Sequence, residues 1–226
     1  MTRLTTAFAA AVALLLPIGR PLLVGLTSAV GIGAGLLTTQ AAYSMTAEDW
    51  FDSGVAKFER GDLQGAIADW TKAIEIDPRY ADSYYSRGFA KSLSGDFKSA
   101  IPDYTKAIEI NPNDADLYFF YRGDAKKNLK DYKGAIQDYT KAIEIDPNDA
   151  GLYNSRGSAK SRLEDYKGAI DDYTKAIEID PLDKYFYSNR ALSTEFMGDP
   201  QGACSDWRKA ADLGHTYAIE WVRNEC

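Results

Sequence analysis

Four near-copies of one phrase follow one another in this chain, and each copy ends at a proline. The copies read AIADWTKAIEIDP, AIPDYTKAIEINP, AIQDYTKAIEIDP and AIDDYTKAIEIDP. Their last residues, Pro78, Pro112, Pro147 and Pro181, lie 34, 35 and 34 residues apart. A period of this length is typical of arrays in which helical units stack on their neighbours rather than around one central core. Such an array offers an extended surface to other molecules.

Small and large side chains recur at fixed places in each unit. A glycine is followed after 12 residues by an alanine, after four more by a large aromatic residue, and after three more by a second alanine. Two helices approach closely only where side chains are small, so we expect the small residues to mark helix crossings and the aromatic residue to fill the space beside them. The four sets are Gly54, Gly88, Gly123, Gly157 and Ala191; Ala66, Ala100, Ala135, Ala169 and Ala203; Trp70, Tyr104, Tyr139, Tyr173 and Trp207; and Ala73, Ala107, Ala142, Ala176 and Ala210.

Turn signals divide each unit into two predicted helices. The proline ends the second helix, because the residue before a proline is disfavoured in helical geometry. An aspartate at the central turn is expected to cap the helix that follows it. The turn pairs are Gly61-Asp62, Gly95-Asp96, Asp131-Tyr132, Asp165-Tyr166 and Gly198-Asp199.

This pattern resembles the tetratricopeptide repeat family over about residues 45 to 214. Trp50-x-x-Ser53-Gly54, Ala66-x-x-x-Trp70 and Pro78 match the pattern of that family. The resemblance implies an all-α, right-handed α-α superhelix of five helix-turn-helix repeats with a C-terminal capping helix. The predicted divisions are 1–44 for a leader, 45–78, 79–112, 113–147, 148–181 and 182–214 for the repeats, and 215–226 for the capping helix.

Three departures from the family pattern stand out. A lysine replaces the aromatic residue expected three positions after the glycine, at Lys57, Lys91, Lys126 and Lys160. The fifth unit has Ala191 in place of the glycine, Pro200 just after its turn and Gly214 near the usual proline position, which suits a unit that need not stack on a successor. The third unit has one extra residue near 118–121, which either a longer loop or a π-bulge would absorb.

The first 44 residues differ in kind from the rest. They contain Arg3 and Arg20 and no acidic residue, with uncharged runs over 4–19 and 21–43. One interpretation is an export signal cleaved near Ala42 or Ser44. The other is a membrane anchor over 21–43, weakened by its glycines and proline.

Both interpretations give the same topology. The arginines precede the apolar segment and acidic residues follow it, so we expect the repeats to lie outside the cytoplasm. Similar chains occur in photosynthetic bacteria, and this resemblance suggests the periplasm or the thylakoid lumen, or a membrane-anchored form. Membrane contact is expected only through an uncleaved leader.

The two cysteines, Cys204 and Cys226, are expected to form a disulfide. They lie 10 residues before and 12 residues after Gly214, at which two antiparallel helices are predicted to meet. A mismatch of two residues corresponds to about 3 Å of helical rise. An exported protein permits the bond. The alternative is two free thiols, and the inward side of the capping helix is expected to carry Tyr217, Ile219 or Trp221, and Val222.

No constellation of catalytic residues is present in the sequence. Its single histidine, His215, is expected at a helix N-terminus, and no zinc, nucleophile-elbow or phosphate-loop motif occurs. We therefore predict no enzymatic activity, no cofactor and no metal site. The net charge of −7 argues against nucleic-acid binding through bulk charge.

A variable strip on the first helices is the candidate partner-binding surface. The resemblance implies that these helices line the concave face, and positions five, nine and twelve of each unit share one side of the helix. The N-terminal part of the strip is aromatic and its C-terminal part is small and polar. The alternative is that Phe51 and Phe58 pack under an N-terminal segment, or that Phe89 belongs to the core. The candidate residues are Phe51, Val55, Tyr85, Phe89, Phe120, Asp124, Lys127, Asn154 and Ser158.

Two further sets of charged residues recur from unit to unit: a column of lysines and a column of aspartates. The lysine column Lys57, Lys91, Lys126 and Lys160 either contacts an acidic partner or covers apolar surface with its stems while its heads reach water. Asp103, Asp138 and Asp172 are predicted to form ordinary exposed helix pairs with Lys106, Lys141 and Lys175. The family's clamp for chaperone tails requires an asparagine at position nine, which this chain lacks, so that activity is not carried over.

Together these features predict a non-enzymatic protein-interaction module. Its groove would take a peptide or helix of a protein partner, in a scaffold or assembly role outside the cytoplasm. The alternative is a structural repeat protein that associates with itself.

Overall fold

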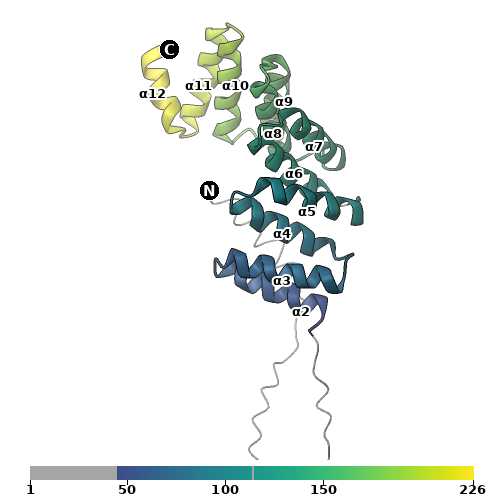
Figure 1. The fold of residues 1–226 in the computed structure, drawn as a ribbon. Coiled ribbons are helices and arrows are strands. Elements are labelled where there is room, and N and C mark those ends of the chain that lie inside the picture. Colours follow the sequence, from purple (N-terminus) through teal and green to yellow (C-terminus); the bar gives the residue numbers. More distant parts are fainter. Residues whose placement is uncertain (1–44, 114) are drawn as a thin grey trace, which may run out of the picture. The chain divides into compact units, whose positions relative to one another are not determined.

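The computed structural model describes residues 45–113 and 115–226 (Figure 1). The predicted signal or anchor lies outside these residues, and the described residues belong to one compact unit. The described part contains helices and no strand. The helices are α2 (Ala47–Glu59), α3 (Leu63–Ile76), α4 (Ala81–Leu93), α5 (Phe97–Ile110), α6 (Asp116–Asn128), α7 (Tyr132–Ile145), α8 (Ala150–Arg162), α9 (Tyr166–Ile179), α10 (Lys184–Phe196), α11 (Pro200–Asp212) and α12 (Thr216–Glu225).

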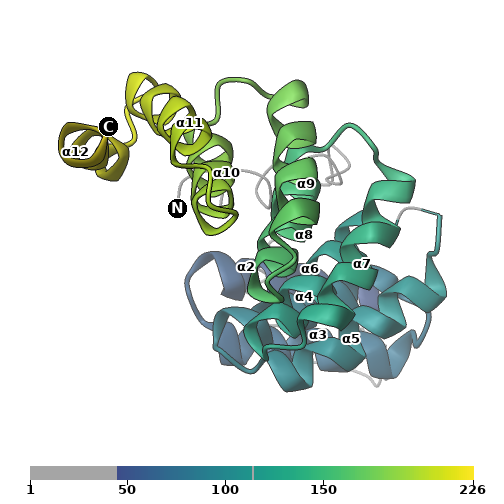
Figure 2. The same cartoon turned by 90° about the horizontal axis from the view of Figure 1, so that it is seen from above.

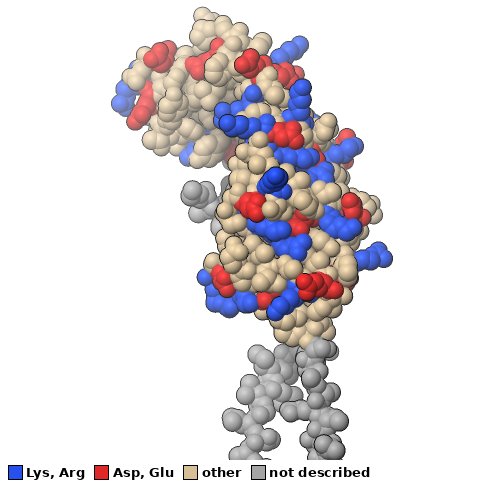
Figure 3. All heavy atoms as spheres, viewed as in Figure 1, with Lys and Arg blue, Asp and Glu red and all other residues tan. Residues whose placement is uncertain are grey.

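Consecutive helices pack side by side as antiparallel pairs, and each pair stacks on the next (Figure 1). Seen from above, the pairs turn progressively from α2–α3 to α10–α11 (Figure 2). On the face drawn in Figure 3, basic and acidic side chains are interspersed. The predicted all-helical fold, with helix-turn-helix repeats and an additional C-terminal helix, is confirmed. Within the described residues, no helix is both long and apolar enough to cross a membrane.

The central turns are built as the sequence predicts. In each unit an aspartate side chain accepts a hydrogen bond from the backbone N–H three residues later, over 2.9–3.2 Å. The residue before each aspartate has a positive φ of 64–85°. It is glycine in three units, but Lys130 and Glu164 in the third and fourth units adopt the same geometry. The capping aspartates are Asp62, Asp96, Asp131, Asp165 and Asp199.

The close helix crossings lie where the small residues predict them. A Cβ atom built on Gly123 would lie 2.8 Å from Cε1 of Tyr139, and Gly54, Gly88 and Gly157 meet the aromatic residues of their own units in the same way. The five aromatic residues are at most 3% exposed. Packing between the two helices of a unit therefore depends on a glycine or alanine that faces a buried ring.

We expect Gly123→Ala to destabilise the array. Alanine gains about 1 kcal/mol in helix propensity, but displacing a buried ring typically costs about 1–3 kcal/mol, so a net loss of about 1 kcal/mol is expected. Urea unfolding followed by circular dichroism measures it. Gly151→Ala is the matched control, because its nearest neighbour is the rotatable Asp149 carboxylate, and it should leave stability unchanged or raise it. Equal effects of the two changes would contradict the crossing interpretation.

The extra residue of the third unit lies in a loop. Five residues separate α5 from α6, whereas four separate α3 from α4, α7 from α8, and α9 from α10. Helix α6 is a regular α-helix of 13 residues. The loop interpretation is confirmed, and the π-bulge alternative is wrong.

Helix α12 covers the end of the last unit. Trp221 and Val222 pack against the cluster around Trp207, and the Cys204 and Cys226 sulfur atoms are bonded. Of the predicted alternatives Ile219 and Trp221, Trp221 is the inward residue, and Ile219 is 44% exposed. Tyr217 is 57% exposed, although its ring meets that of Trp207 at 5.7 Å, and Ala218 is buried. His215 caps the helix as expected: its Nδ1 accepts a hydrogen bond from the Ala218 N–H at 3.2 Å.

Reduction of the disulfide is expected to loosen α12. The bond closes a loop with a sequence separation of 22 residues, and a loop of that size corresponds to about 3 kcal/mol of chain entropy. Hydrogen exchange should therefore accelerate in α12 after reduction and thiol alkylation, while amides of α6 to α8 keep their rates. Unchanged protection of α12 would mean that its contacts with Trp207 suffice.

Candidate functional site

The strip on the first helices is largely half-buried. Seven of the nine predicted partner-binding residues are partly accessible, namely Phe51, Val55, Phe120, Asp124, Lys127, Asn154 and Ser158. Tyr85 and Phe89 are only 8% and 6% exposed. The strip therefore has two buried members, both on α4.

Tyr85 and Phe89 belong to a cluster of rings between α4, α5 and α6. The Tyr85 ring centroid lies 5.3 Å from that of Tyr118 and 5.6 Å from that of Tyr121, and Phe89 meets Tyr121 edge-on at 5.1 Å. Burial raises the pKa values of the Tyr85, Tyr104 and Tyr121 hydroxyls above their ordinary value. These rings join the second and third units and form the floor of the strip.

The other aromatic members of the strip are also bound into the core. Phe51 and Val55 pack on the cluster that contains Trp70, and Phe120 packs on the cluster that contains Tyr139. The alternative that Phe89 belongs to the core is therefore confirmed, and Phe51 and Phe120 are packed on core clusters too. The exposed edges of these side chains still contribute apolar surface to the strip.

The polar half of the strip is held by hydrogen bonds. The Asp124 carboxylate accepts from the Tyr139 hydroxyl at 2.6 Å and from Lys127 Nζ at 2.8 Å. Burial, followed by the Asp124 charge, raises the pKa of Tyr139 well above its ordinary value, so this hydroxyl stays a donor. Asn189 Nδ2 donates to Asn154 Oδ1 at 2.9 Å and links the fifth unit to the fourth. These contacts fix the polar groups that a partner would meet.

A ladder of buried charges runs through the array, and the sequence analysis missed it. Each second helix carries a buried aspartate, and in units two to five an arginine 16 residues earlier donates two hydrogen bonds to it, over 2.7–3.1 Å. The pairs are Arg87–Asp103, Arg122–Asp138, Arg156–Asp172 and Arg190–Asp206. Bidentate pairs of this kind are strong and geometrically specific.

The arginines also bind the preceding unit. Each donates from Nη1 to a threonine hydroxyl of the unit before it, over 3.0–3.2 Å. In the first unit the arginine position is Ser53, whose hydroxyl donates to Asp69 at 2.6 Å. Burial raises the pKa of Asp69, but the bonds from Lys57 and Ser53 outweigh it and hold the pKa below its usual value. The threonines are Thr71, Thr105, Thr140 and Thr174.

The lysine column is a second part of this ladder. Lys57, Lys91, Lys126 and Lys160 each place Nζ at 2.7–2.8 Å from the buried aspartate of the same unit. The two readings of this column are therefore corrected, because the ammonium groups bind internal carboxylates. The predicted pairs of these aspartates with Lys106, Lys141 and Lys175 are wrong too: those lysines pair with Glu109, Glu144 and Glu178.

A repeated signal in the sequence points to this ladder. An arginine stands directly before the small residue in units two to five, and an aspartate stands directly before the large aromatic in all five. The two columns keep a separation of 16 residues, which places them on facing helices of one unit. The described residues contain no cluster of three His, Cys, Asp or Glu side chains that could hold a metal ion.

Comparisons with known proteins agree with this geometry. A family model described as TPR repeat matches residues 54–92 and 123–163, and one described as Tetratricopeptide repeat matches 81–114 and 150–182. Together they cover more than half of the chain. A search of curated proteins gives no match.

Solved structures with the same fold include MamA and YrrB. A MamA crystal structure superposes with a TM-score of 0.71 at 22% identity, over 80% of this chain and 96% of MamA. MamA 41-end from Desulfovibrio magneticus RS-1 gives a TM-score of 0.71 at 20% identity. The match covers 74% of this chain and 94% of that protein. YrrB, described as a TPR protein with an unusual peptide-binding site, superposes with a TM-score of 0.69 at 21% identity. The match covers 78% of this chain and 92% of YrrB. The chain is therefore a tetratricopeptide-repeat protein.

Proposed function

We propose that this protein is a non-enzymatic interaction module that holds a peptide or helix of a protein partner along the strip of its first helices. The observation that carries the proposal is that the repeats differ mainly on their first helices. The second helices of the first four units are nearly identical, but position nine of the first helices changes from unit to unit, through Val55, Phe89, Asp124, Ser158 and Leu192. Phe89 is buried, but Val55, Asp124, Ser158 and Leu192 are partly exposed, so burial in a core does not by itself fix the residue type at these four positions.

The accessible part of the strip defines the chemistry of the partner. Asn154 and Ser158 are half-buried polar residues on α8, and Leu192 is 40% exposed on α10. Amide and hydroxyl groups beside an aliphatic side chain suit the backbone and apolar side chains of a bound peptide. YrrB, which shares the fold, is described by its peptide-binding site.

The proposed place of action is outside the cytoplasm, in a scaffold or assembly role. Three observations support it: the apolar leader, the acidic residues that follow it, and the bonded cysteine pair, which an oxidising compartment permits. The periplasm, the thylakoid lumen and a membrane-anchored form all fit these observations. Intact mass of the protein from its native host, with and without reduction, distinguishes a cleaved leader from a retained one.

A blocking substitution tests the groove. Peptides selected from a displayed library against the full chain should lose binding, by at least about tenfold, when Ser158→Arg places a long charged side chain in the strip. Gln137→Arg is the matched control, because it adds the same residue at an exposed position of α7. Titration calorimetry measures both, and circular dichroism verifies the fold.

Two outcomes would contradict this proposal. Equal affinities of the two variants would place peptide binding elsewhere. If sedimentation velocity instead shows that Ser158→Arg changes only the size of an oligomer, the strip is a contact between copies of this chain, and the protein is a self-associating repeat protein.

A further inference from the structure

The fifth unit lacks one cation of the charge ladder. Where the first four units carry a lysine, the fifth carries Thr194. Among the residues that the structure describes, Arg190 is the one cation bonded to Asp206, through two hydrogen bonds of 2.7 Å. The other four buried aspartates each bind a lysine at 2.7–2.8 Å. The fifth unit thus has the carboxylate of this arrangement without its ammonium group.

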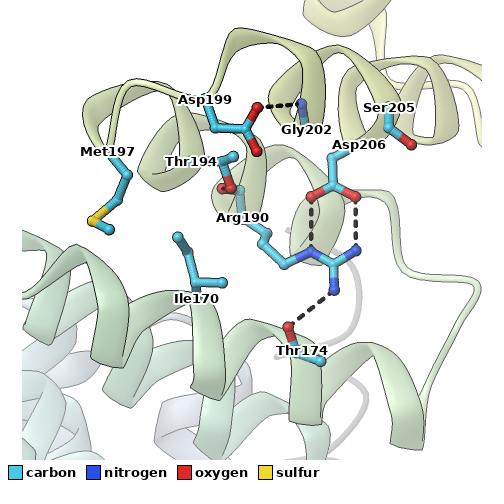
Figure 4. Close-up of a pocket in the computed structure, with 9 residues that line it drawn as sticks. All are labelled: Ile170, Thr174, Arg190, Thr194, Met197, Asp199, Gly202, Ser205 and Asp206. Carbon is cyan, nitrogen blue, oxygen red and sulfur yellow. Dashed lines mark hydrogen bonds and ion pairs between the residues drawn. The ribbon is translucent and has the colours of Figure 1, made fainter.

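An open pocket lies beside Asp206, on the side from which the lysines reach their aspartates in the other units. It measures about 510 Å³ and is lined by residues of α9, α10 and α11 and of the turn between α10 and α11, with Thr194 and Asp206 among them (Figure 4). The Asp206 side chain is 11% exposed, against 3–6% for the other four aspartates. Solvent therefore reaches a carboxylate that an internal lysine covers elsewhere in the array.

Two of the lysines also use a second acceptor, and the equivalent residue of the fifth unit lines the pocket. Lys91 Nζ and Lys160 Nζ each donate to a backbone carbonyl at 3.3 Å, that of Ser99 and that of Gly168. Both carbonyls lie four residues before the buried aspartate of their unit. The equivalent residue of the fifth unit is Gly202, which lines the pocket.

We propose that this pocket binds a primary ammonium group on an alkyl chain, as presented by the lysine side chain of a partner. The ammonium group donates to the Asp206 carboxylate and the Gly202 carbonyl, as Lys91 and Lys160 do in their own units. Ile170 and Met197 supply apolar surface for the alkyl stem. Arg190 keeps its two bonds to Asp206, because in the other units one carboxylate accepts from arginine and lysine together.

This site is separate from the strip of the first helices. Thr194 follows Leu192 of the strip by two residues, which turns it by about 200° around α10. Ligands of the pocket and of the strip therefore approach α10 from opposite sides. The pocket goes beyond the proposed function, and either site can fail its test without the other.

Amide chemical shifts test the pocket with a defined probe. The probe is a capped Ala-Ala-Lys-Ala-Ala peptide, and its control is the same peptide with an acetylated lysine, which has no charge. Titration into the isotope-labelled full chain should shift the amides of Thr194, Gly202 and Asp206 with the lysine peptide alone. The binding is expected to be weak and to weaken further with added salt, since its main attraction is electrostatic.

Adding a lysine to the fifth unit, or removing one from the fourth, tests where the lysine peptide binds. Thr194→Lys restores the internal lysine and should abolish the shifts, while Gln201→Lys adds the same charge at an exposed position of α11 and should leave them nearly unchanged. Lys160→Thr should open an equivalent pocket in the fourth unit and add shifts at Gly168 and Asp172.

The results of these titrations either support or overturn the proposed ammonium site. The proposal is overturned if both peptides give equal shifts, or if Thr194→Lys and Gln201→Lys behave alike. A parallel titration with 1,5-diaminopentane distinguishes the source of the amine: tighter binding of the peptide supports a partner's lysine, and tighter binding of the diamine supports a small free amine as the ligand of the same pocket.

Discussion

Replacing Asp138 with alanine is expected to lower the free energy of unfolding by about 3–5 kcal/mol, since removing one member of a buried ionic network leaves its partners uncompensated. Asp138 is buried, and both Arg122 and Lys126 lie 2.7 Å from it. Arg122 also donates to Thr105 of the preceding unit. The loss therefore affects the packing within the third unit and its junction with the second.

Urea unfolding of the variant and the parent chain measures this effect, and hydrogen exchange locates it. Amides of α5 to α7 should lose the most protection. Glu144→Ala is the matched control, because it removes a carboxylate from α7 whose pair with Lys141 is exposed, and such pairs contribute little. If both variants unfold at the same urea concentration as the parent, the ladder does not stabilise the array.

Replacing Tyr139 with alanine is expected to cost about 3–5 kcal/mol, as for other large buried aromatic residues. The ring is fully buried, faces Gly123 across the helix crossing and lies 6.1 Å from the Phe120 ring. Its removal leaves a cavity between α6 and α7 that backbone movement cannot readily fill, because the neighbouring units hold both helices. The same urea and exchange measurements apply.

Tyr139→Phe separates the ring from its hydroxyl. The phenylalanine keeps the packing and loses only the hydrogen bond to Asp124, so we expect a cost of about 1 kcal/mol. If Tyr139→Phe were as damaging as Tyr139→Ala, the stabilisation would come from the link to Asp124 rather than from packing at the crossing.

The sequence predicts those parts of this fold that depend on hydrogen bonds within one turn or on the sizes of facing side chains. The capping aspartates act within one turn, and the pairing of Gly123 with Tyr139 follows from the need for a small residue opposite a large one. Both recur at a constant spacing, so that one physical argument applies to every unit. The extra residue of the third unit was ambiguous, since a loop and a bulge accommodate the same insertion.

The predictions that failed concern side chains with more than one neighbour within reach. Asp138 lies three residues before Lys141 on the same helix, but its partners are Arg122 and Lys126 on the facing helix. The position of Phe89 on α4 similarly left open whether it belongs to the strip or to the core, and the adjacent unit covers it through Tyr121. Helical spacing identifies the side of a helix, and it does not identify which neighbouring helix lies against that side.

The ladder of arginines gives the array a direction. Each arginine reaches back to a threonine of the unit before it, and the two ends of the array are adapted accordingly. Ser53 stands at the arginine position of the first unit, before which the described residues contain no further repeat. Arg208 stands at the threonine position of the fifth unit and donates to the main-chain oxygen of Cys226 instead. An internal unit thus carries both halves of the junction, and duplicating residues 148–181 in place should lengthen the protein by one repeat without any redesign of its ends.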